Sequence, residues 1–223
     1  LYQERLLTFD FEARAWTWDL AQINAMNITD NVVELMAGKI RKLPKDTQEA
    51  MKLAACIGAS FDLEMLGVIR QKEPEAVNKD LDTALAEGLV VPLEKRFKFA
   101  HDRIQQAVYS LIPEQDKSEV HLKIGKLLIE RLDEAGQEAA LFDIVNQWNQ
   151  GREIIEDPAE QLTLARLNLR AGSKAKQASA FRPAYAYLET GISLLPKDAW
   201  QAHYELSRDL YTLAAEAAYL NGD

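Results

Sequence analysis

The chain has 223 residues, of which 48% are hydrophobic, and is therefore long enough to bury a core in one or two domains. Its formal net charge of -9 and isoelectric point near 5.0 argue against nucleic acid and anionic membrane surfaces as partners, because both are bound through basic surfaces. The single cysteine, Cys56, fits a small core residue in a reducing compartment, and no apolar run approaches the roughly 20 residues of a membrane span, which favours a cytoplasmic protein.

Residues 28–112 combine helical patterns with one short hairpin. Leu89–Val91 and Phe97–Phe99 are predicted strands on either side of the turn PLEKR, and a further helix follows from Asp102. Helices followed by a small hairpin and another helix predict a winged-helix module. The helices that apolar spacing predicts before the hairpin cover 31–40, 44–57, 62–69 and 75–87.

The junction between the second strand and the next helix carries His101 and Asp102. Asp102 stands where a helix cap is expected, and Gln105 follows three residues later, so the two are predicted to form a capping-box-like pair. This pairing gives Asp102 a structural role and leaves the role of His101 open.

Long helical runs fill residues 113–223, and we expect them to form antiparallel pairs. The predicted runs cover 118–132, 138–155, 160–178, 183–195 and 200–220. In the third and fourth runs, small and apolar residues recur at tetratricopeptide-like intervals, which predicts close contact between the two helices. The residues at these intervals are Gly172, Ala184, Leu188, Gly191 and Pro196.

Polar and aromatic residues in the chain have mainly structural interpretations. Asn146 and Asn149 flank Trp148 and are candidates for hydrogen bonds between repeats. All four tryptophans accompany apolar periodicity, so we expect them to be packing anchors rather than ligand platforms. They are Trp16, Trp18, Trp148 and Trp200.

Residues for catalysis or metal binding are not arranged in any recognisable motif. Gly125-Lys126 is followed by Leu127, which does not satisfy a phosphate-binding loop. His101, His121 and His203 lie far apart and have no second ligand at metal spacing. We therefore expect this chain to have no catalytic residues, no metal site and no cofactor held by its own residues.

Several separate motifs resemble the region that follows the nucleotide-binding domain in large bacterial and fungal signalling proteins. Those proteins combine a protein-kinase-like head, a STAND-class AAA-type ATPase, helical repeats and a histidine-kinase tail of the two-component type. The motifs, which span nearly the whole chain, are ITDNVVELM, LAACIGASFD, FAHDRIQQAVYSLI, HLKIG, LFDIVNQWN, LNLRAGSKAKQASAF and LNGD.

The resemblance implies a mainly α fold that belongs to a longer protein. Residues 1–27 would continue from an upstream ATPase domain, residues 28–112 would form the winged-helix part with its small β-hairpin, and residues 113–223 would form antiparallel tetratricopeptide-like repeats. The parent protein would be an ATPase and kinase that binds ADP or ATP, although no kinase motif is present here.

The resemblance implies a ligand for His101. In STAND ATPases a similar His-Asp step occurs at the end of the winged-helix domain, and its histidine contacts bound ADP and helps to hold the closed state. Phe99 takes the apolar place before the step, but Ala100 replaces the methionine that immune receptors commonly have there. The ordinary alternative is a histidine that bonds a nearby carbonyl where a strand meets a helix.

Three functions remain open on the sequence alone. The preferred one is a non-catalytic regulatory module that closes over nucleotide in an upstream domain and senses a signal ligand or protein partner through its repeats. The second is the winged-helix region of an ATP-dependent transcriptional activator, although acidic residues in 75–87 disfavour contact with DNA phosphates. The third is a free-standing helical-repeat scaffold for protein interactions.

Overall fold

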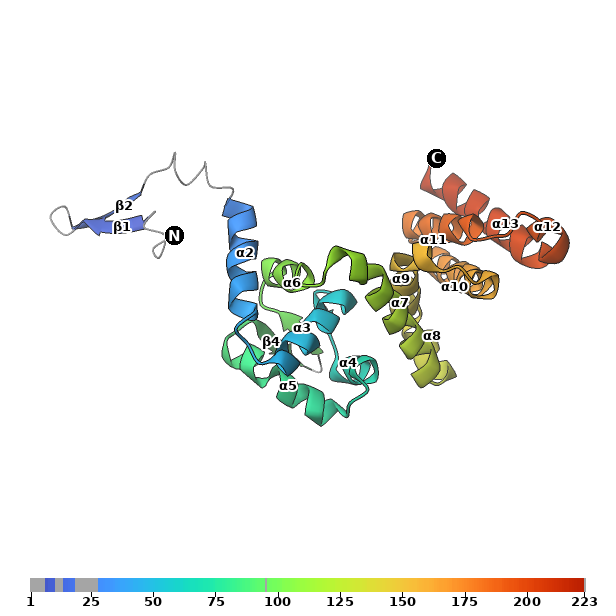
Figure 1. The fold of residues 1–223 in the computed structure, drawn as a ribbon. Helices are drawn as coiled ribbons and strands as arrows, with labels where there is room; N and C mark the ends of the chain where they lie inside the picture. Colours follow the sequence, from blue (N-terminus) through green and yellow to red (C-terminus); the bar gives the residue numbers. More distant parts are fainter. Residues whose placement is uncertain (1–6, 11–13, 19–27, 95, 223) are drawn as a thin grey trace. The chain divides into compact units, whose positions relative to one another are not determined.

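A computed structural model describes residues 7–10, 14–18, 28–94 and 96–222 of the chain. These residues form a mainly α-helical fold with two small antiparallel sheets, which confirms the predicted fold class (Figure 1). The chain divides into two compact units. We call 1–63 with 75–112 the N-terminal unit, and 64–74 with 113–223 the C-terminal unit.

Much of the predicted segment 1–27 lies outside the described residues. Its described parts are strands β1 (Leu7–Asp10) and β2 (Ala15–Trp18), which pair antiparallel from Leu7 opposite Trp18 to Asp10 opposite Ala15. The exposed fractions of Trp16 and Trp18 are 48% and 57%, so the prediction that they are packing anchors was wrong. Both indoles lie on β2 of a two-stranded ribbon, and all four residues of that strand are exposed.

The N-terminal unit packs helices around a three-stranded sheet. Apart from the hairpin of 7–18, its described elements, in chain order, are α2 (Ile28–Ile40), α3 (Lys45–Ile57), β3 (Ser60–Phe61), α5 (Pro74–Ala86), β4 (Val90–Leu93), β5 (Arg96–Phe99) and α6 (Asp102–Tyr109). Helix α3 ends before Gly58, as the sequence predicted, but it begins at Lys45, so Pro44 lies at the N-cap and not in the first turn. Phe61 is fully buried and its ring lies 5.7 Å from that of Phe99, so the sheet contributes directly to the core.

The hairpin is tighter than the sequence suggested, and the sheet has one more strand. Leu93 pairs directly with Arg96, so most of PLEKR belongs to the strands and not to a loop. Glu94 has a φ of 52°, the left-handed conformation that tight hairpin turns favour. Strand β3 is only two residues long, too short for a period-two pattern to reveal it, and it pairs with β5 to give the order β3-β5-β4.

The C-terminal unit is helical throughout its described part. Its elements are α4 (Leu63–Arg70), α7 (Glu114–Arg131), α8 (Glu134–Ala139), α9 (Leu141–Gln150), the 3-10 helix η1 (Arg152–Ile154), α10 (Pro158–Gln177), α11 (Phe181–Ser193), α12 (Ala199–Ala202) and α13 (Tyr204–Asn221). Two predicted helices are each divided. The run 138–155 breaks at Ala140 and Gly151, and the run 200–220 breaks at His203, whose φ and ψ are -136° and 48°.

Helices α10 and α11 form an antiparallel pair, with α13 packed against α11 (Figure 1). A Cβ on Gly172 would lie 2.5 Å from Leu188 Cγ, and one on Gly191 would lie 2.7 Å from Leu210 Cδ2 and 3.3 Å from Ala165 O. Gly172 thus meets Leu188, whereas Gly191, later on α11, meets the earlier residue Ala165 on α10, as expected for antiparallel helices. The prediction that both glycines occupy close helix contacts is confirmed.

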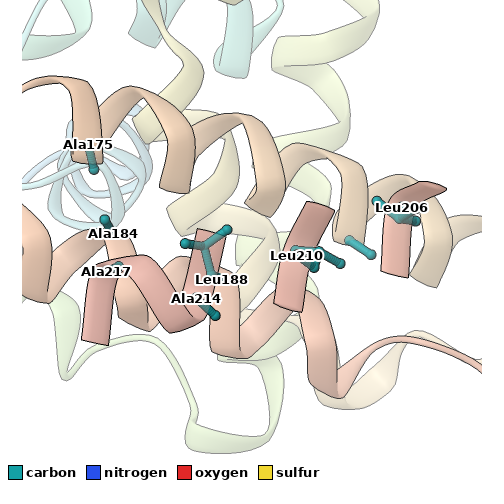
Figure 2. Packing of buried hydrophobic residues seen from close by; sticks show 8 residues of the cluster. Ala175, Ala184, Leu188, Leu206, Leu210, Ala214 and Ala217 are labelled. Carbon is teal, nitrogen blue, oxygen red and sulfur yellow. The ribbon is translucent and has the colours of Figure 1, made fainter. Parts of the chain in front are cut away.

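A core of small and branched residues fills the space between these three helices (Figure 2). Leu188 and Leu210 are fully buried, and alanines on the facing helices leave room for them. The alanines of this cluster that Figure 2 labels are Ala175, Ala184, Ala214 and Ala217. Alternation of small and large side chains lets the helices pack closely without voids.

Helices α7 and α9 form a second close pair. A Cβ on Gly125 would lie only 1.9 Å from Trp148 Cδ1, so the indole lies directly on the glycine backbone. Trp148 is 5% exposed, which confirms its predicted anchoring role. Trp200, by contrast, is 48% exposed on the short helix α12, so the prediction that it is a packing anchor was wrong; its ring lies beside those of Tyr204 and Tyr211, which are also exposed.

Candidate functional site

Two places in the described structure gather polar groups in arrangements suited to binding. The first is the junction of β5 and α6 in the N-terminal unit, where the sequence placed His101. The second is a hollow in the C-terminal unit, lined by residues of α8, α9, α10 and α13.

His101, and not Asp102, caps helix α6. Its Nδ1 accepts a hydrogen bond from the backbone N–H of Arg103 at 3.1 Å, while Asp102 is already the first residue of the helix. The predicted cap at Asp102 was therefore wrong. Gln105 does not complete a capping box either, since its Nε2 donates to the backbone O of Ala55 on α3 and ties the two helices together.

The cap fixes which imidazole nitrogen carries the proton in neutral His101. Because Nδ1 accepts a hydrogen bond, the proton of the neutral ring resides on Nε2. His101 is exposed, and no described residue forms a hydrogen bond with its Nε2. The ring thus presents an N–H donor to the outside at the start of an eight-residue helix, where the helix dipole also favours negative charge.

The hollow in the C-terminal unit has a volume of about 700 Å³. Arg170 and Lys174 stand one turn apart on α10, and Glu138 of α8 accepts hydrogen bonds of 2.8 Å from both side chains. These two bonds, that from Lys174 first, hold the pKa of Glu138 below its ordinary value. Lys174 also donates to the backbone O of Glu138 at 2.8 Å and lies 5.8 Å from the ring centre of Phe142.

The far wall of this hollow comes from α13. Arg208 and Asp209 line it, and the guanidinium pairs with the carboxylate of its own neighbour at 2.7 Å. The wall therefore brings a third cation to the hollow. Sequence reasoning missed the whole site. The spacing of Arg170 and Lys174 placed both cations on one helix face, but only the packing of α8 and α13 against α10 makes that face one side of a hollow.

Two predicted polar contacts between helices are present beside this region. Asn149 and Asn168 exchange side-chain hydrogen bonds of 2.9 Å in both directions, linking α9 to α10. Asn146 accepts a hydrogen bond of 2.8 Å from the Tyr187 hydroxyl, linking α9 to α11. Burial raises the pKa of Tyr187, so this hydroxyl stays a donor.

One further buried polar pair links α7 to α9. His121 and Gln147 are each 5% exposed, and the Nδ1 of the histidine lies 2.6 Å from the glutamine Oε1. Since an amide oxygen only accepts, Nδ1 carries the proton. Burial lowers the pKa of His121, and the nearby charge of Lys117 lowers it further, whereas the bond to Gln147 acts in the opposite direction.

Neither a metal-binding cluster nor a membrane-spanning helix occurs among the described residues. In those parts of the chain, no three His, Cys, Asp or Glu side chains gather into a set that could hold a metal ion. No helix there combines the length and apolarity that crossing a bilayer requires.

Comparison with known proteins links the chain to signal transduction. The chain is 27% identical, over 285 aligned residues, to the hybrid signal transduction histidine kinase G of Dictyostelium discoideum. The alignment covers 100% of this chain but only 8% of that kinase. No protein family model matches the chain, and no solved structure matches it. The similarity supports the interpretation of this chain as a region of a signalling protein.

Proposed function

We propose that this chain is a non-catalytic regulatory segment of a STAND-type signalling ATPase and sensor kinase. In this proposal, the N-terminal unit is a winged-helix module that closes over ADP held by an upstream nucleotide-binding domain. The C-terminal unit is an array of tetratricopeptide-like repeats that binds a protein partner or signal ligand. The similarity to a histidine kinase supports the signalling context, and the order of helices and hairpin in residues 28–109 suits the winged-helix assignment.

The observation that carries the proposal is that the two ring nitrogens of His101 have different roles. Its Nδ1 is occupied by the backbone N–H of Arg103, which fixes the ring and leaves the Nε2–H donor exposed. A fixed N–H donor at a helix start is suited to a phosphate oxygen, because charge-assisted hydrogen bonds are stronger than neutral ones.

Closure over ADP follows from differential affinity. If His101 bonds the diphosphate only when the N-terminal unit lies against the nucleotide domain, ADP binds the closed arrangement more tightly and shifts the population towards it. Loss of ADP would then release the unit. The chain supplies one donor to this closure and no step of hydrolysis.

The DNA-binding alternative is not favoured by the surface of α5. This helix carries Glu75, Asp80 and Asp82 against Lys79, so it would repel a phosphate backbone. A free-standing repeat scaffold would explain the C-terminal unit but would give the exposed donor of His101 no role.

The test is ADP exchange in the intact protein that contains this chain. His101→Asn keeps a side-chain oxygen that can cap α6 but removes the imidazole Nε2–H, so it separates the cap from the ligand contact. We expect it to speed release of fluorescent ADP by about fivefold or more, the equivalent of one lost hydrogen bond. The matched control is His203→Asn, the same chemical change at a histidine of the C-terminal unit.

Equal release rates for wild type and His101→Asn would overturn the ADP contact. Faster release in the control as well would point to general destabilisation and would also count against the contact. Thermal unfolding of both variants, measured alongside, shows whether the cap has been kept.

A further inference from the structure

The hollow in the C-terminal unit concentrates positive charge in an acidic chain. Arg170, Lys174 and Arg208 line it together with only two carboxylates, Glu138 and Asp209, although the chain as a whole carries a net charge of -9. A local excess of cations in an acidic molecule attracts an acidic ligand and repels a basic one.

Glu138 already occupies this cationic site as an internal carboxylate. It belongs to α8, a helix of six residues in which none is buried, and its side chain is 52% exposed. Ion pairs between exposed side chains contribute little to stability, so little holds the Glu138 side chain in place. A carboxylate from outside could take over its two hydrogen bonds, and Glu138 would turn into solvent without exposing a core residue.

Lys174 is better fixed than Glu138. Lys174 also donates to a backbone carbonyl of α8 and lies over the ring of Phe142, so it keeps its position when the carboxylate changes. Arg208 pairs with its own sequence neighbour, Asp209, and forms no ion pair with another helix in the described part of the chain. Its remaining donors can therefore face a ligand without breaking a contact between helices.

The dimensions suit a short peptide. A volume of about 700 Å³ lies within the range of about 300–1,000 Å³ that is typical of ligand sites. The lining runs along α10 from Leu169 to Gln177, a distance of about 12 Å, which matches three or four residues of extended chain. Leu169 and Leu213 on opposite walls provide apolar contact for side chains between the carboxylates.

We propose that this hollow binds an acidic peptide segment of a partner protein, one carboxylate of which displaces Glu138 from Arg170 and Lys174. The proposal rests on the partner-binding role given above to the repeats and adds the chemistry of the partner. Glu138 thereby acts as a built-in competitor that lowers affinity for weakly acidic sequences.

The test uses the chain itself with a fluorescein-labelled peptide, Leu-Glu-Glu-Leu-Glu-Glu, in a fluorescence anisotropy titration. The matched peptide Leu-Gln-Gln-Leu-Gln-Gln keeps the shape and removes the charge. We expect the acidic peptide to bind about fivefold or more tightly than the neutral one. Arg170→Gln and Lys174→Gln should each weaken its binding by about the same factor.

Glu138→Gln should change affinity in the opposite direction. Removing the internal competitor frees both cations, so the acidic peptide should bind severalfold more tightly to this variant. The control is Lys176→Gln. Lys176 also lies on α10 and pairs with Glu216 of α13, but it does not line the hollow, so the same loss of charge should leave affinity unchanged.

Several results would overturn the proposal: no binding at millimolar peptide, equal binding of both peptides, an effect of Lys176→Gln as large as that of Lys174→Gln, or weaker binding by Glu138→Gln. Displacement of the peptide by equimolar inorganic phosphate or free glutamate would reveal a simple anion site and reject the peptide. No nucleotide is present in this assay, so its failure leaves the ADP contact of His101 intact, and failure of ADP exchange leaves this result intact.

Discussion

Asn149 and Asn168 form a closed pair in which each side-chain amide donates to the carbonyl oxygen of the other at 2.9 Å. Asn168 is fully buried in α10 and also donates to the backbone O of Leu164. The pair joins α9 to α10 through two parallel hydrogen bonds, an arrangement that is satisfied only when both amides are present.

Replacing either asparagine should therefore cost more than an ordinary surface hydrogen bond. Asn168→Ala leaves the half-buried amide of Asn149 without its partner, and we expect a loss of about 1–3 kcal/mol in unfolding free energy. Urea unfolding of both single variants and of the double variant should give a coupling energy of at least about 0.5 kcal/mol. Asn146→Ala is the control, because that exposed residue makes one hydrogen bond, to Tyr187. Additive effects of the replacements at Asn149 and Asn168 would contradict the closed pair.

The contact of Gly172 with Leu188 should make even a methyl group harmful. Gly172→Ala gains helix propensity, but its Cβ would overlap Leu188 Cγ, and overpacking of this kind costs about 1–3 kcal/mol. Gly38→Ala is the matched control, because no described atom beyond its own stretch of helix lies within 4 Å of the added Cβ, and the helix should gain about 0.5–1 kcal/mol. Melting temperatures that shift alike in both variants would be inconsistent with the packing.

His121 should make stability depend on pH. Its pKa is lowered in the folded state from the ordinary 6.5, so the unfolded chain binds the proton first. Its contribution to stability is therefore present above pH 6.5 and is lost as the pH falls through and below that value. His121→Gln should flatten the rise of unfolding free energy between about pH 5.5 and 7.5. Parallel profiles for wild type and variant would show that His121 does not titrate in this way.

Replacing His101 should remove the cap of α6, whereas replacing Asp102 should leave it in place. His101→Ala removes the acceptor for the N–H of Arg103, and losing a helix cap costs about 0.5–2 kcal/mol. Asp102→Ala removes only a favourable charge in the first turn, which is worth about 0.3–1 kcal/mol, and His101→Asn should restore most of the lost stability. A larger loss with Asp102→Ala than with His101→Ala would return the cap to the aspartate.

The sequence was most informative where spacing alone decides the contact. The intervals between Gly172, Leu188 and Gly191 predicted close helix packing because two antiparallel helices with a short connection can meet in few registers. Helix breaks were harder to predict. Neither Ala140 nor His203 is a residue that ends helices by its own preference, so those two breaks arise from tertiary packing.

The two candidate sites also differ in how far the sequence could predict them. His101 could be singled out because a strand met a helix there, but its cap was assigned to Asp102, a residue type that caps far more often. The hollow around Glu138 could not be predicted, because charged residues on three separate helices look like solvated faces until the helices are packed together.

The contact of Gly125 with Trp148 has an evolutionary consequence. Because the indole occupies the space where any other side chain at position 125 would begin, neither residue can change alone without loss of the α7–α9 contact. Among natural variants of this region, the two positions should therefore change together, with a larger residue at 125 accompanied by a smaller one at 148. Pairs of this kind would let the helix register be traced in divergent homologues whose other residues no longer resemble these.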